Sequence, residues 1–393
     1  MVRRVLPWSM RRPSPQTATL LVTALAFHVD MLLYYLLVPL LPRYAEELHL
    51  NPLEVSLLFG SYAVGLLAAT LPIARITDHH GRRKPMLWGL AGLGATTLVF
   101  AFSRNFSLLV GARFLQGVSG SATWLPGMAL LADHFPSESR GRAMGTAFAA
   151  ANLGVLLGPP LSGFLDQHMG PSSPFLVGAA LVALDAMGRL FLLSDTEPAV
   201  VPRIPFRQLL SNPVIRLFAG AMALGSALWA LLESTLPIDL HARLGLSPSG
   251  IGFGFAAMAL AHTLTSPLIG RLSDKLGRVR ALRMGLVLVA LLLALPALLP
   301  KPWMVIGAMM TLGSAASFIM SPCSPAVADQ VERQGSQGYA SAFSILNLSY
   351  AIGMMVGPLV GGVLVQGLGP AWALGLSGLG FAVYLMAARR ITV

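Results

Sequence analysis

The sequence alternates between long apolar stretches and short polar connections along its whole length. About 20 apolar residues suffice to cross a bilayer as a helix. Twelve stretches of that size occur, at 17–41, 53–75, 84–103, 106–132, 140–166, 172–194, 213–239, 248–271, 280–299, 303–328, 338–366 and 370–389. Because lipid offers no partner to backbone N–H and C=O groups, such stretches must satisfy them internally, as helices do. The pattern predicts an all-α membrane protein with 12 transmembrane helices.

The composition argues against a water-soluble protein. Of the 393 residues, 55% are hydrophobic and 11% are charged, whereas soluble domains carry about 25% charged residues. The single cysteine, Cys323, excludes a disulfide framework and a cysteine-based metal cluster. The sequence contains neither a phosphate-binding Gly-x-x-x-x-Gly-Lys-Ser/Thr motif nor a metal-binding His-Glu-x-x-His motif. We therefore expect no enzyme, no cofactor, no metal and no ATP-driven transport by this chain alone.

The net charge of +11 is distributed unevenly among the connections. An even number of spans places both termini on the same side, and 20 of the 27 Lys and Arg fall on that side. The other side has four, namely Arg43, Arg104, Arg243 and Lys301. By the positive-inside rule this asymmetry predicts cytoplasmic termini in a multi-pass protein of the inner or plasma membrane. The charge is thus a topology signal, so we expect no nucleic-acid partner, and we expect a monomer in the lipid bilayer.

Two motifs each occur twice, at nearly the same offset. The first has an aspartate, a glycine turn and an arginine, at Asp78, Gly81 and Arg82 and again 196 residues later at Asp274, Gly277 and Arg278. The second is Gly-x-x-x-Gly-Pro, at Gly154, Gly158 and Pro159 and again 199 residues later at Gly353, Gly357 and Pro358. The repeats predict two pseudo-symmetric six-helix bundles, 1–194 and 213–393, joined by a cytoplasmic linker at 195–212. Such duplicated bundles face each other across a central site in transporters.

Each repeated motif suggests a mechanical role. A carboxylate at a helix end can accept hydrogen bonds from a neighbouring helix N-terminus and pair with arginine, so we expect the first motif to gate the conformations. A solvated turn with topology charges is the alternative. The glycines of the second motif allow close helix approach, and its prolines weaken the helix locally. We expect a hinge between the halves, although ordinary helix packing explains the same pattern equally well.

Five ionisable residues fall inside the predicted spans, namely Asp30, Arg113, Asp185, Arg189 and Glu233. Each costs about 2.5–3.5 kcal/mol at a helix centre and is therefore a functional candidate. Asp185 and Arg189 are spaced i, i+4 and could neutralise each other. Asp30 and Glu233 have no basic residue nearby in sequence, and a long-range pairing of either with Arg113 stays open.

A buried carboxyl group without a partner favours its protonated form and ionises when a cation arrives. A proton and a cationic substrate would then compete for the same acid. Aromatic side chains could add cation–π contacts, although for each one alone packing or a lipid-facing position is the favoured interpretation. The candidate substrate site comprises Asp30, Glu233, Tyr34, Tyr62, Trp124, Asn152, Trp229, Asn347 and Tyr350, and Tyr35 is a further aromatic residue near the acids. His28 and His262 are candidate proton relays, with a structural hydrogen bond as the favoured interpretation.

Several of these motifs resemble those of the major facilitator superfamily. The segment Asp78–Arg83 resembles its signature loop, and Leu109-x-x-x-Arg113-x-x-Gln116-Gly117 resembles its fourth-helix motif. The glycines from Gly145 to Gly163 resemble its fifth-helix antiporter motif, with Ser162 where glycine is usual. The resemblance implies two six-helix bundles that alternate access to a central site.

The first, sixth and seventh spans are similar to those of vesicular monoamine and acetylcholine transporters and their bacterial relatives among the drug:proton antiporters. The similar residues surround Asp30, Asp185 and Glu233. The resemblance implies that Asp30 and Glu233 contact the substrate amine and that Arg113 takes part in proton-linked switching. We accordingly assign proton coupling to Asp30, Arg113, Asp185 and Glu233.

The sequence departs from that family at four places. Tyr62 replaces a lysine, Met31 replaces an asparagine, and Ser317 and Asn347 replace two aspartates. The carboxylates linked to proton coupling in the C-terminal half are therefore missing. If this protein is coupled to protons, we expect Asp30, Glu233 or Asp185 to carry them.

The sequence favours a secondary active transporter that exports organic cations, either amines or cationic drugs, in exchange for protons. One alternative is an importer or uniporter of a neutral or anionic metabolite that uses Arg113 and Arg189. A second alternative, from a different class, is a membrane sensor that does not transport. Gating motifs in both halves argue against the sensor.

Overall fold

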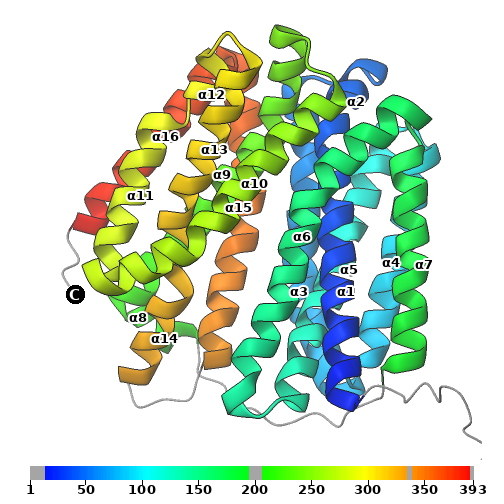
Figure 1. The fold of residues 1–393 in the computed structure, drawn as a ribbon, viewed down its shortest axis with the longest axis vertical. Coiled ribbons are helices and arrows are strands. Elements are labelled where there is room, and N and C mark those ends of the chain that lie inside the picture. Colours follow the sequence, from blue (N-terminus) through cyan, green and yellow to red (C-terminus); the bar gives the residue numbers. More distant parts are fainter. Residues whose placement is uncertain (1–13, 194–205, 334–338, 390–393) are drawn as a thin grey trace, which may run out of the picture.

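The computed structural model describes residues 14–193, 206–333 and 339–389 (Figure 1). Within these residues the chain is helical and contains no strand. Ten helices are long and apolar enough to cross a membrane, and α16 contributes a shorter apolar helix, Pro370–Met386. Many large hydrophobic side chains lie on the surface, for example Phe191 and Leu291, as expected for a surface that faces lipid. The structure is therefore that of an all-α membrane protein.

The N-terminal bundle contains six spans. The first is α1 (Pro15–Leu36), which continues through the 3₁₀ helix η1 (Val38–Leu40) into α2 (Leu41–Glu47). The others are α3 (Pro52–His80), α4 (Arg83–Phe102), α5 (Phe106–His134), α6 (Ser137–Met169) and α7 (Ser173–Leu192). Local sequence sets the helix starts. Asn51 and Glu54, for example, form a capping box at the start of α3, which satisfies two free backbone N–H groups.

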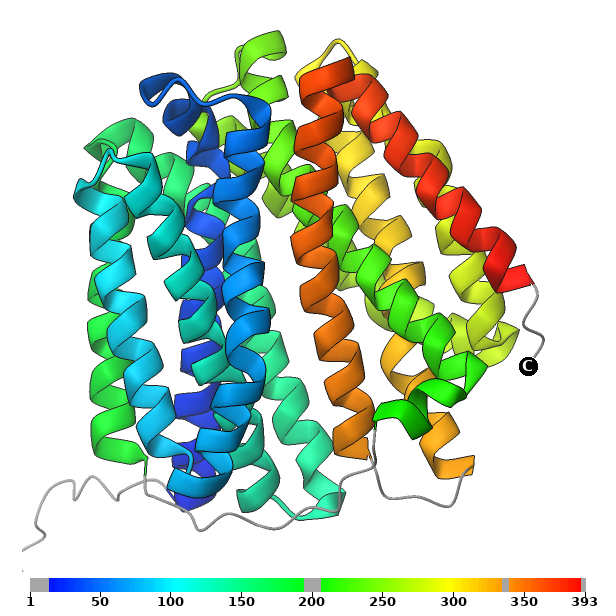
Figure 2. The ribbon, with the colours of Figure 1, turned by 180° about the vertical axis from the view of Figure 1, so that it is seen from behind.

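The C-terminal bundle repeats this arrangement after the short α8 (Phe206–Ser211). It contains α9 (Pro213–Leu244), α10 (Pro248–Leu276), α11 (Arg278–Leu292) with α12 (Leu295–Leu298), α13 (Pro302–Met320) with α14 (Cys323–Arg333), α15 (Tyr339–Leu368) and α16 (Pro370–Arg389). Each of the 12 predicted spans thus corresponds to one helix or to a broken helix. Figure 2 shows the two bundles side by side from behind.

The structure differs from the sequence-based elements in three respects. Half of the spans extend several residues beyond the predicted limits, because the hydrophobic pattern ends where lipid ends and the helix continues into polar surroundings. The first, ninth and tenth spans are broken next to Pro39, Pro296 and Pro322, since proline removes a backbone donor. Finally, α5 falls outside the ten apolar helices, and it carries the buried polar residues Arg113 and Gln116.

The predicted linker 195–212 lies partly outside the described residues. Residues 195–205 are not described, and Phe206–Ser211 form α8. The boundaries of the two halves at 194 and 213 therefore stay a prediction.

The two bundles touch along α6 with α10 and along α3 with α15. We call the end of the molecule with Arg82 and Arg278 the basic end, and the end with loops 48–51 and 245–247 the opposite end. A Cβ on Gly252 would overlap the backbone of Pro159, and one on Gly163 would overlap Pro248. These contacts lie toward the opposite end. At the same end, Nε2 of His241 in the C-terminal bundle lies 3.4 Å from Oε1 of Glu46 in the N-terminal bundle.

In the repeated Gly-x-x-x-Gly-Pro motif, the glycines contact their own bundle and the proline contacts the other bundle. Gly154 and Gly158 pack on α1, and Gly353 and Gly357 pack on α9, so the glycines hold helices together within each bundle. The prolines instead face the other bundle: Pro159 lies against Gly252 of α10, and Pro358 lies near Gly60 of α3. The contacts of the glycines are those of ordinary helix packing, and a hinge role for this motif stays a prediction.

Candidate substrate and proton site

Asp30 lies midway along α1 and is almost completely buried. Its Oδ2 accepts a hydrogen bond from Nε1 of Trp124 on α5, at 2.7 Å. The Trp124 ring stacks on Phe27, with ring centroids 4.0 Å apart, which fixes the direction of the indole N–H. Oδ1 of Asp30 has no hydrogen-bond partner in the part of the chain that the structure describes.

The hydroxyl group of Tyr62 and the carboxylate of Asp30 meet above Gly120 of α5. A Cβ built on Gly120 would lie 2.7 Å from Tyr62 Oη and 3.7 Å from Asp30 Oδ2. A Cβ at this position would therefore overlap the hydroxyl of Tyr62 and make an ordinary contact with Asp30. Sequence reasoning missed Gly120, although it follows Arg113 by seven residues and so lies on the same face of the helix.

Glu233 on α9 is the second buried acid, and it faces the N-terminal bundle. Its Oε2 accepts a hydrogen bond from the hydroxyl of Tyr34 on α1, at 3.1 Å. Tyr35 and Tyr350 also interact electrostatically with Glu233. Oε1 of Glu233 has no hydrogen-bond partner among the described residues. The Tyr34–Glu233 bond therefore joins the two bundles at the level of the site.

Arg113 on α5 is also buried, and its guanidinium group packs against the rings of Tyr34 and Tyr62. Its Nη1 donates to Oε1 of Gln116 at 2.6 Å, and its Nη2 donates to the backbone oxygen of Tyr34 at 3.3 Å. The guanidinium carbon lies 4.5 Å from the ring centroid of Tyr34 and 5.2 Å from that of Tyr62. Arg113 is thus held by neutral groups, and its positive charge acts on Asp30 and Glu233 from a distance.

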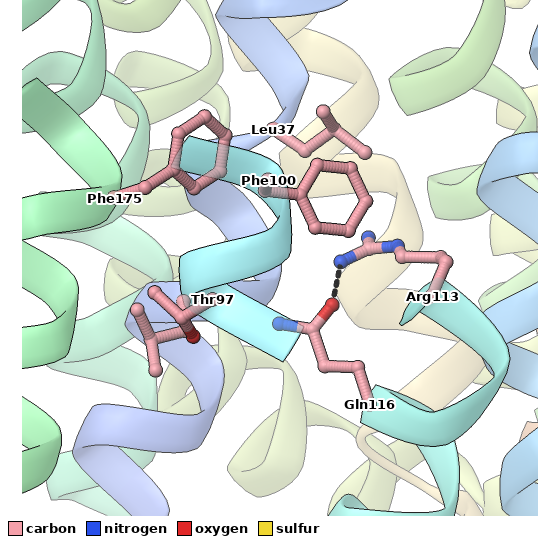
Figure 3. A pocket seen from close by; sticks show the side chains of 7 residues that line it. Leu37, Thr97, Phe100, Arg113, Gln116 and Phe175 are labelled. Carbon is pink, nitrogen blue, oxygen red and sulfur yellow. Dashed lines mark hydrogen bonds between the residues drawn. The ribbon is translucent and has the colours of Figure 1, made fainter. Parts of the chain in front are cut away.

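A small cavity lies beside Arg113 and Gln116 (Figure 3). Leu37 of the α1–η1 junction, Thr97 and Phe100 of α4 and Phe175 of α7 complete most of its lining. The cavity is inside the N-terminal bundle and is mainly apolar.

Asp185 and Arg189 of α7 form the ion pair that their i, i+4 spacing suggests. Nη2 of Arg189 lies 2.5 Å from Oδ2 of Asp185, and both side chains are fully buried. Nη1 of Arg189 also donates to the backbone oxygen of Met86, at 2.7 Å. Asp185 therefore has a permanent basic neighbour, unlike Asp30 and Glu233, and its assignment to proton coupling stays a prediction.

Among the described residues, the remaining candidates form no hydrogen bond with Asp30 or Glu233. Trp229 is buried one turn before Glu233 on α9, and its ring is 5.5 Å from that of His262. The Asn152 and Asn347 side chains, on α6 and α15, are exposed. His28 is bound through Nδ1 to the backbone oxygen of Ala150, at 3.0 Å. A substrate role for the asparagines stays a prediction.

The gating motifs form matching contacts in the two bundles. Arg82 Nε lies 3.1 Å from Asp133 Oδ2, and Arg278 Nε lies 3.3 Å from Asp329 Oδ2. Arg278 also pairs with Asp274. The Asp78 side chain lies outside the described residues.

Two features of these arginine–aspartate contacts go beyond the sequence prediction. Asp133 and Asp329 were missed, although they are 196 residues apart, the same offset as Asp78 and Asp274. Gly81 and Gly277 have φ of 79° and 95°, a region that only glycine adopts readily.

The groups around the two acids are of the chemical types that suit a small cation. Two carboxylates, each with one oxygen unpartnered, are bordered by the rings of Tyr34, Tyr62 and Trp124. An ammonium group can donate to such oxygens and lie against such rings. No group of three or more His, Cys, Asp or Glu side chains that could hold a metal ion occurs in the described ranges.

Comparisons with known proteins match most of the chain to one family. A family model described as Major Facilitator Superfamily matches residues 23–238 and, a second time, 217–392. The synaptic vesicular amine transporter of Bos taurus is 30% identical over 341 residues, which cover 86% of this chain and 66% of that protein. The chromaffin granule amine transporter of Homo sapiens is 31% identical over 84% of this chain and 64% of its own length. The chain thus spans just under two thirds of the length of these relatives.

Solved structures agree on the fold. A bacterial homologue of the human lysosomal transporter Spinster, in an inward-facing and unoccupied conformation, has a TM-score of 0.81 and 15% identity. That match covers 96% of this chain and 97% of the other. The human organic anion transporter MFSD10 has a TM-score of 0.68 and 21% identity, over 96% and 100% of the two chains. At these identities the likeness shows the fold alone.

Proposed function

Because the chain belongs to the major facilitator superfamily, we propose that it is a secondary transporter that exports amines or cationic drugs in exchange for protons. It would act as a monomer, by alternating access of its two bundles. The observation that carries the proposal is the pair of buried acids, Asp30 and Glu233, which keep one free oxygen each. The curated relatives named above are amine transporters, which supports the same substrate class.

The chemistry of exchange follows from burial. An ionised carboxylate is costly in a low-dielectric interior, so an acid without a basic partner is stabilised either by a proton or by a bound cation. Asp30 and Glu233 lie in separate bundles, and a ligand that contacts both links the bundles. Competition between the two occupants at the same oxygens makes uptake of one release the other.

The arrangement of the basic residues disfavours an anionic substrate. The Arg189 side chain is committed to Asp185, Met86 and Thr123. Arg113 is bound to Gln116 and to the Tyr34 backbone. Among the described residues, Arg113 and Arg189 each keep one unpartnered donor, Nε, but their terminal nitrogens are already engaged, whereas Asp30 and Glu233 each offer a free carboxylate oxygen.

The proposed direction and location rest on charge. The basic end carries Arg82 and Arg278 in its loops, and by the positive-inside rule it faces the cytoplasm. Substrate would then leave the cytoplasm across the inner or plasma membrane. Residues 1–13 and 390–393, which contain the termini, lie outside the described residues.

Transport by purified protein in liposomes tests the proposal. An imposed pH gradient should drive accumulation of at least one labelled amine from a panel, with protons moving the other way. Asp30→Asn and Glu233→Gln should each reduce this uptake at least tenfold. Glu332→Gln, an exposed glutamate at the end of α14, is the matched control and should leave uptake unchanged.

The contrary results are equally definite. Uptake of every tested amine that ignores the pH gradient would contradict proton exchange. Wild-type rates in Asp30→Asn would remove the proposed substrate site. Saturable uptake of organic acids, lost in Arg113→Gln but retained in Asp30→Asn, would favour the anion alternative.

A further inference from the structure

A second cluster of polar groups lies inside the C-terminal bundle, around His262 of α10. Nδ1 of His262 is 3.2 Å from the backbone oxygen of Gly313 and 3.0 Å from Oγ of Ser317, both on α13. Oγ of Ser317 is in turn 2.9 Å from Oγ1 of Thr265 and 3.3 Å from Oγ of Ser266. The cluster therefore holds one imidazole among three hydroxyl groups.

The partners of Nδ1 determine which nitrogen of His262 can take up a proton. A carbonyl oxygen can only accept a hydrogen bond, so the contact with Gly313 requires the hydrogen to be on Nδ1. In the neutral ring the other nitrogen, Nε2, then carries the lone pair. The His262 side chain is half-buried, so it is not sealed from its surroundings. Nε2 is thus the basic atom of the cluster.

An aromatic ring connects this histidine to the substrate site. The Trp229 ring lies 5.5 Å from the imidazole, in an edge-on arrangement with an interplanar angle of 79°. This contact places the imidazole next to α9, the helix that also carries Glu233. Trp229 precedes Glu233 by four residues on α9, which places both side chains on the same face of that helix.

Few other charges bear on His262. The helices packed against α10 are α6, α9, α11, α13 and η1. Among their described residues, the acidic, basic and histidine side chains other than Glu233 of α9 all lie within six residues of a helix end, as Arg142, Asp239 and Arg283 do, and α13 and η1 have none.

We propose that His262 is a proton-binding site of the C-terminal bundle, loaded at Nε2 and used together with Asp30 and Glu233 in the exchange cycle. This inference rests on the proposed function. One proton enters from the side with the higher proton concentration, binds Nε2 and leaves on the other side, so no bond other than N–H forms or breaks. An ionisable side chain at this depth is costly to retain, and a proton relay is a function that its position serves.

His262→Asn separates titration from structure. The side-chain amide of asparagine can replace the Nδ1–H donor toward Gly313, but it has no basic nitrogen. In liposomes, the variant should keep amine–amine exchange without a pH gradient within about twofold of wild type. It should lose at least tenfold in gradient-driven accumulation, and a trapped pH-sensitive dye should record fewer protons moved per amine.

Two further variants complete the test. His168→Asn is the control, because His168 is an exposed histidine on α6 whose Nδ1 is likewise bound to a backbone oxygen, at 2.9 Å. Ser317→Ala keeps Nε2 and removes a hydroxyl partner of Nδ1. It should shift the pH profile of uptake without abolishing transport, and it serves where His262→Asn does not fold.

The outcomes separate the two proposals. Wild-type accumulation and proton count in His262→Asn, or an unchanged pH profile in Ser317→Ala, overturn the role of His262 and leave amine–proton exchange standing. A wild-type protein that moves amines without protons overturns both.

Discussion

Gly120 offers a direct test of how tightly the site around Asp30 is built. In Gly120→Ala the new Cβ would lie 2.7 Å from Tyr62 Oη, well inside a C–H···O contact of about 3.3 Å. Such overpacking costs about 1–3 kcal/mol, against a gain of up to about 1 kcal/mol from replacing glycine in a helix. The net change is small, so the overlap must be isolated with a control.

Gly111→Ala is that control, because Gly111 is on the same helix with no atom of another residue within 4 Å of a new Cβ. It should gain the helix term without the overlap, so the two variants should differ by about 1–3 kcal/mol. Thermal unfolding in detergent can be followed with a thiol-reactive dye, since the only cysteine, Cys323, is fully buried. The Tm of Gly120→Ala should be the lower of the two, and its amine KM should rise about tenfold for each 1.4 kcal/mol lost at the site.

A double variant decides whether the hydroxyl of Tyr62 causes this effect. Tyr62→Phe removes Oη and leaves the ring carbon Cζ 3.5 Å from the new Cβ, an ordinary contact. Adding Gly120→Ala to Tyr62→Phe should therefore cost almost nothing in Tm. Equal losses in both backgrounds, or equal Tm values for Gly120→Ala and Gly111→Ala, would refute the packing described for the site.

Three further predictions concern other contacts. Asp185→Asn leaves Arg189 buried without its counter-charge and should destabilise the protein by about 3–5 kcal/mol, seen as a lower Tm; an unchanged Tm would contradict the buried pair. Trp124→Phe keeps an aromatic ring but removes the N–H donor to Asp30, and should weaken amine binding by about 1.5–3 kcal/mol in a competition assay. Arg82→Gln and Asp133→Asn should give non-additive losses of Tm when combined, with an interaction energy of about 0.5–3 kcal/mol; additive losses would show that the two side chains act independently.

The sequence predicts the helices well because lipid imposes a simple rule on them. A span must be apolar and about 20 residues long, so its position can be read from composition, as at 370–389, where the helix has the predicted limits. The breaks near Pro296 and Pro322 are harder to anticipate. The helices that contain Pro159 and Pro358 are continuous, so the presence of proline alone does not determine where a helix breaks.

Contacts within one helix are predictable from spacing, whereas contacts between helices are not. Asp185 and Arg189 are four residues apart, and their pairing follows from helix geometry. Tyr34 and Glu233 are 199 residues apart, and their hydrogen bond depends on how the two bundles dock. For the same reason the sequence did not indicate which helix Gly154 packs on, and the structure places it against α1. Only the offset of 196 residues could have pointed to Asp133 and Asp329.

The unpartnered oxygens of Asp30 and Glu233 set the energetics of the proposed cycle. A buried acceptor without a partner costs about 1–3 kcal/mol, so the empty site is the expensive state and either occupant relieves it. Arg113 is close enough for its charge to act on both acids, but its hydrogen bonds go to Gln116 and to the Tyr34 backbone. A direct ion pair with Arg113 would satisfy an acid permanently and remove the advantage of binding a proton or an amine. The rings of Tyr34 and Tyr62 hold the guanidinium of Arg113 away from the two carboxylates, and this separation keeps the carboxylates available for exchange.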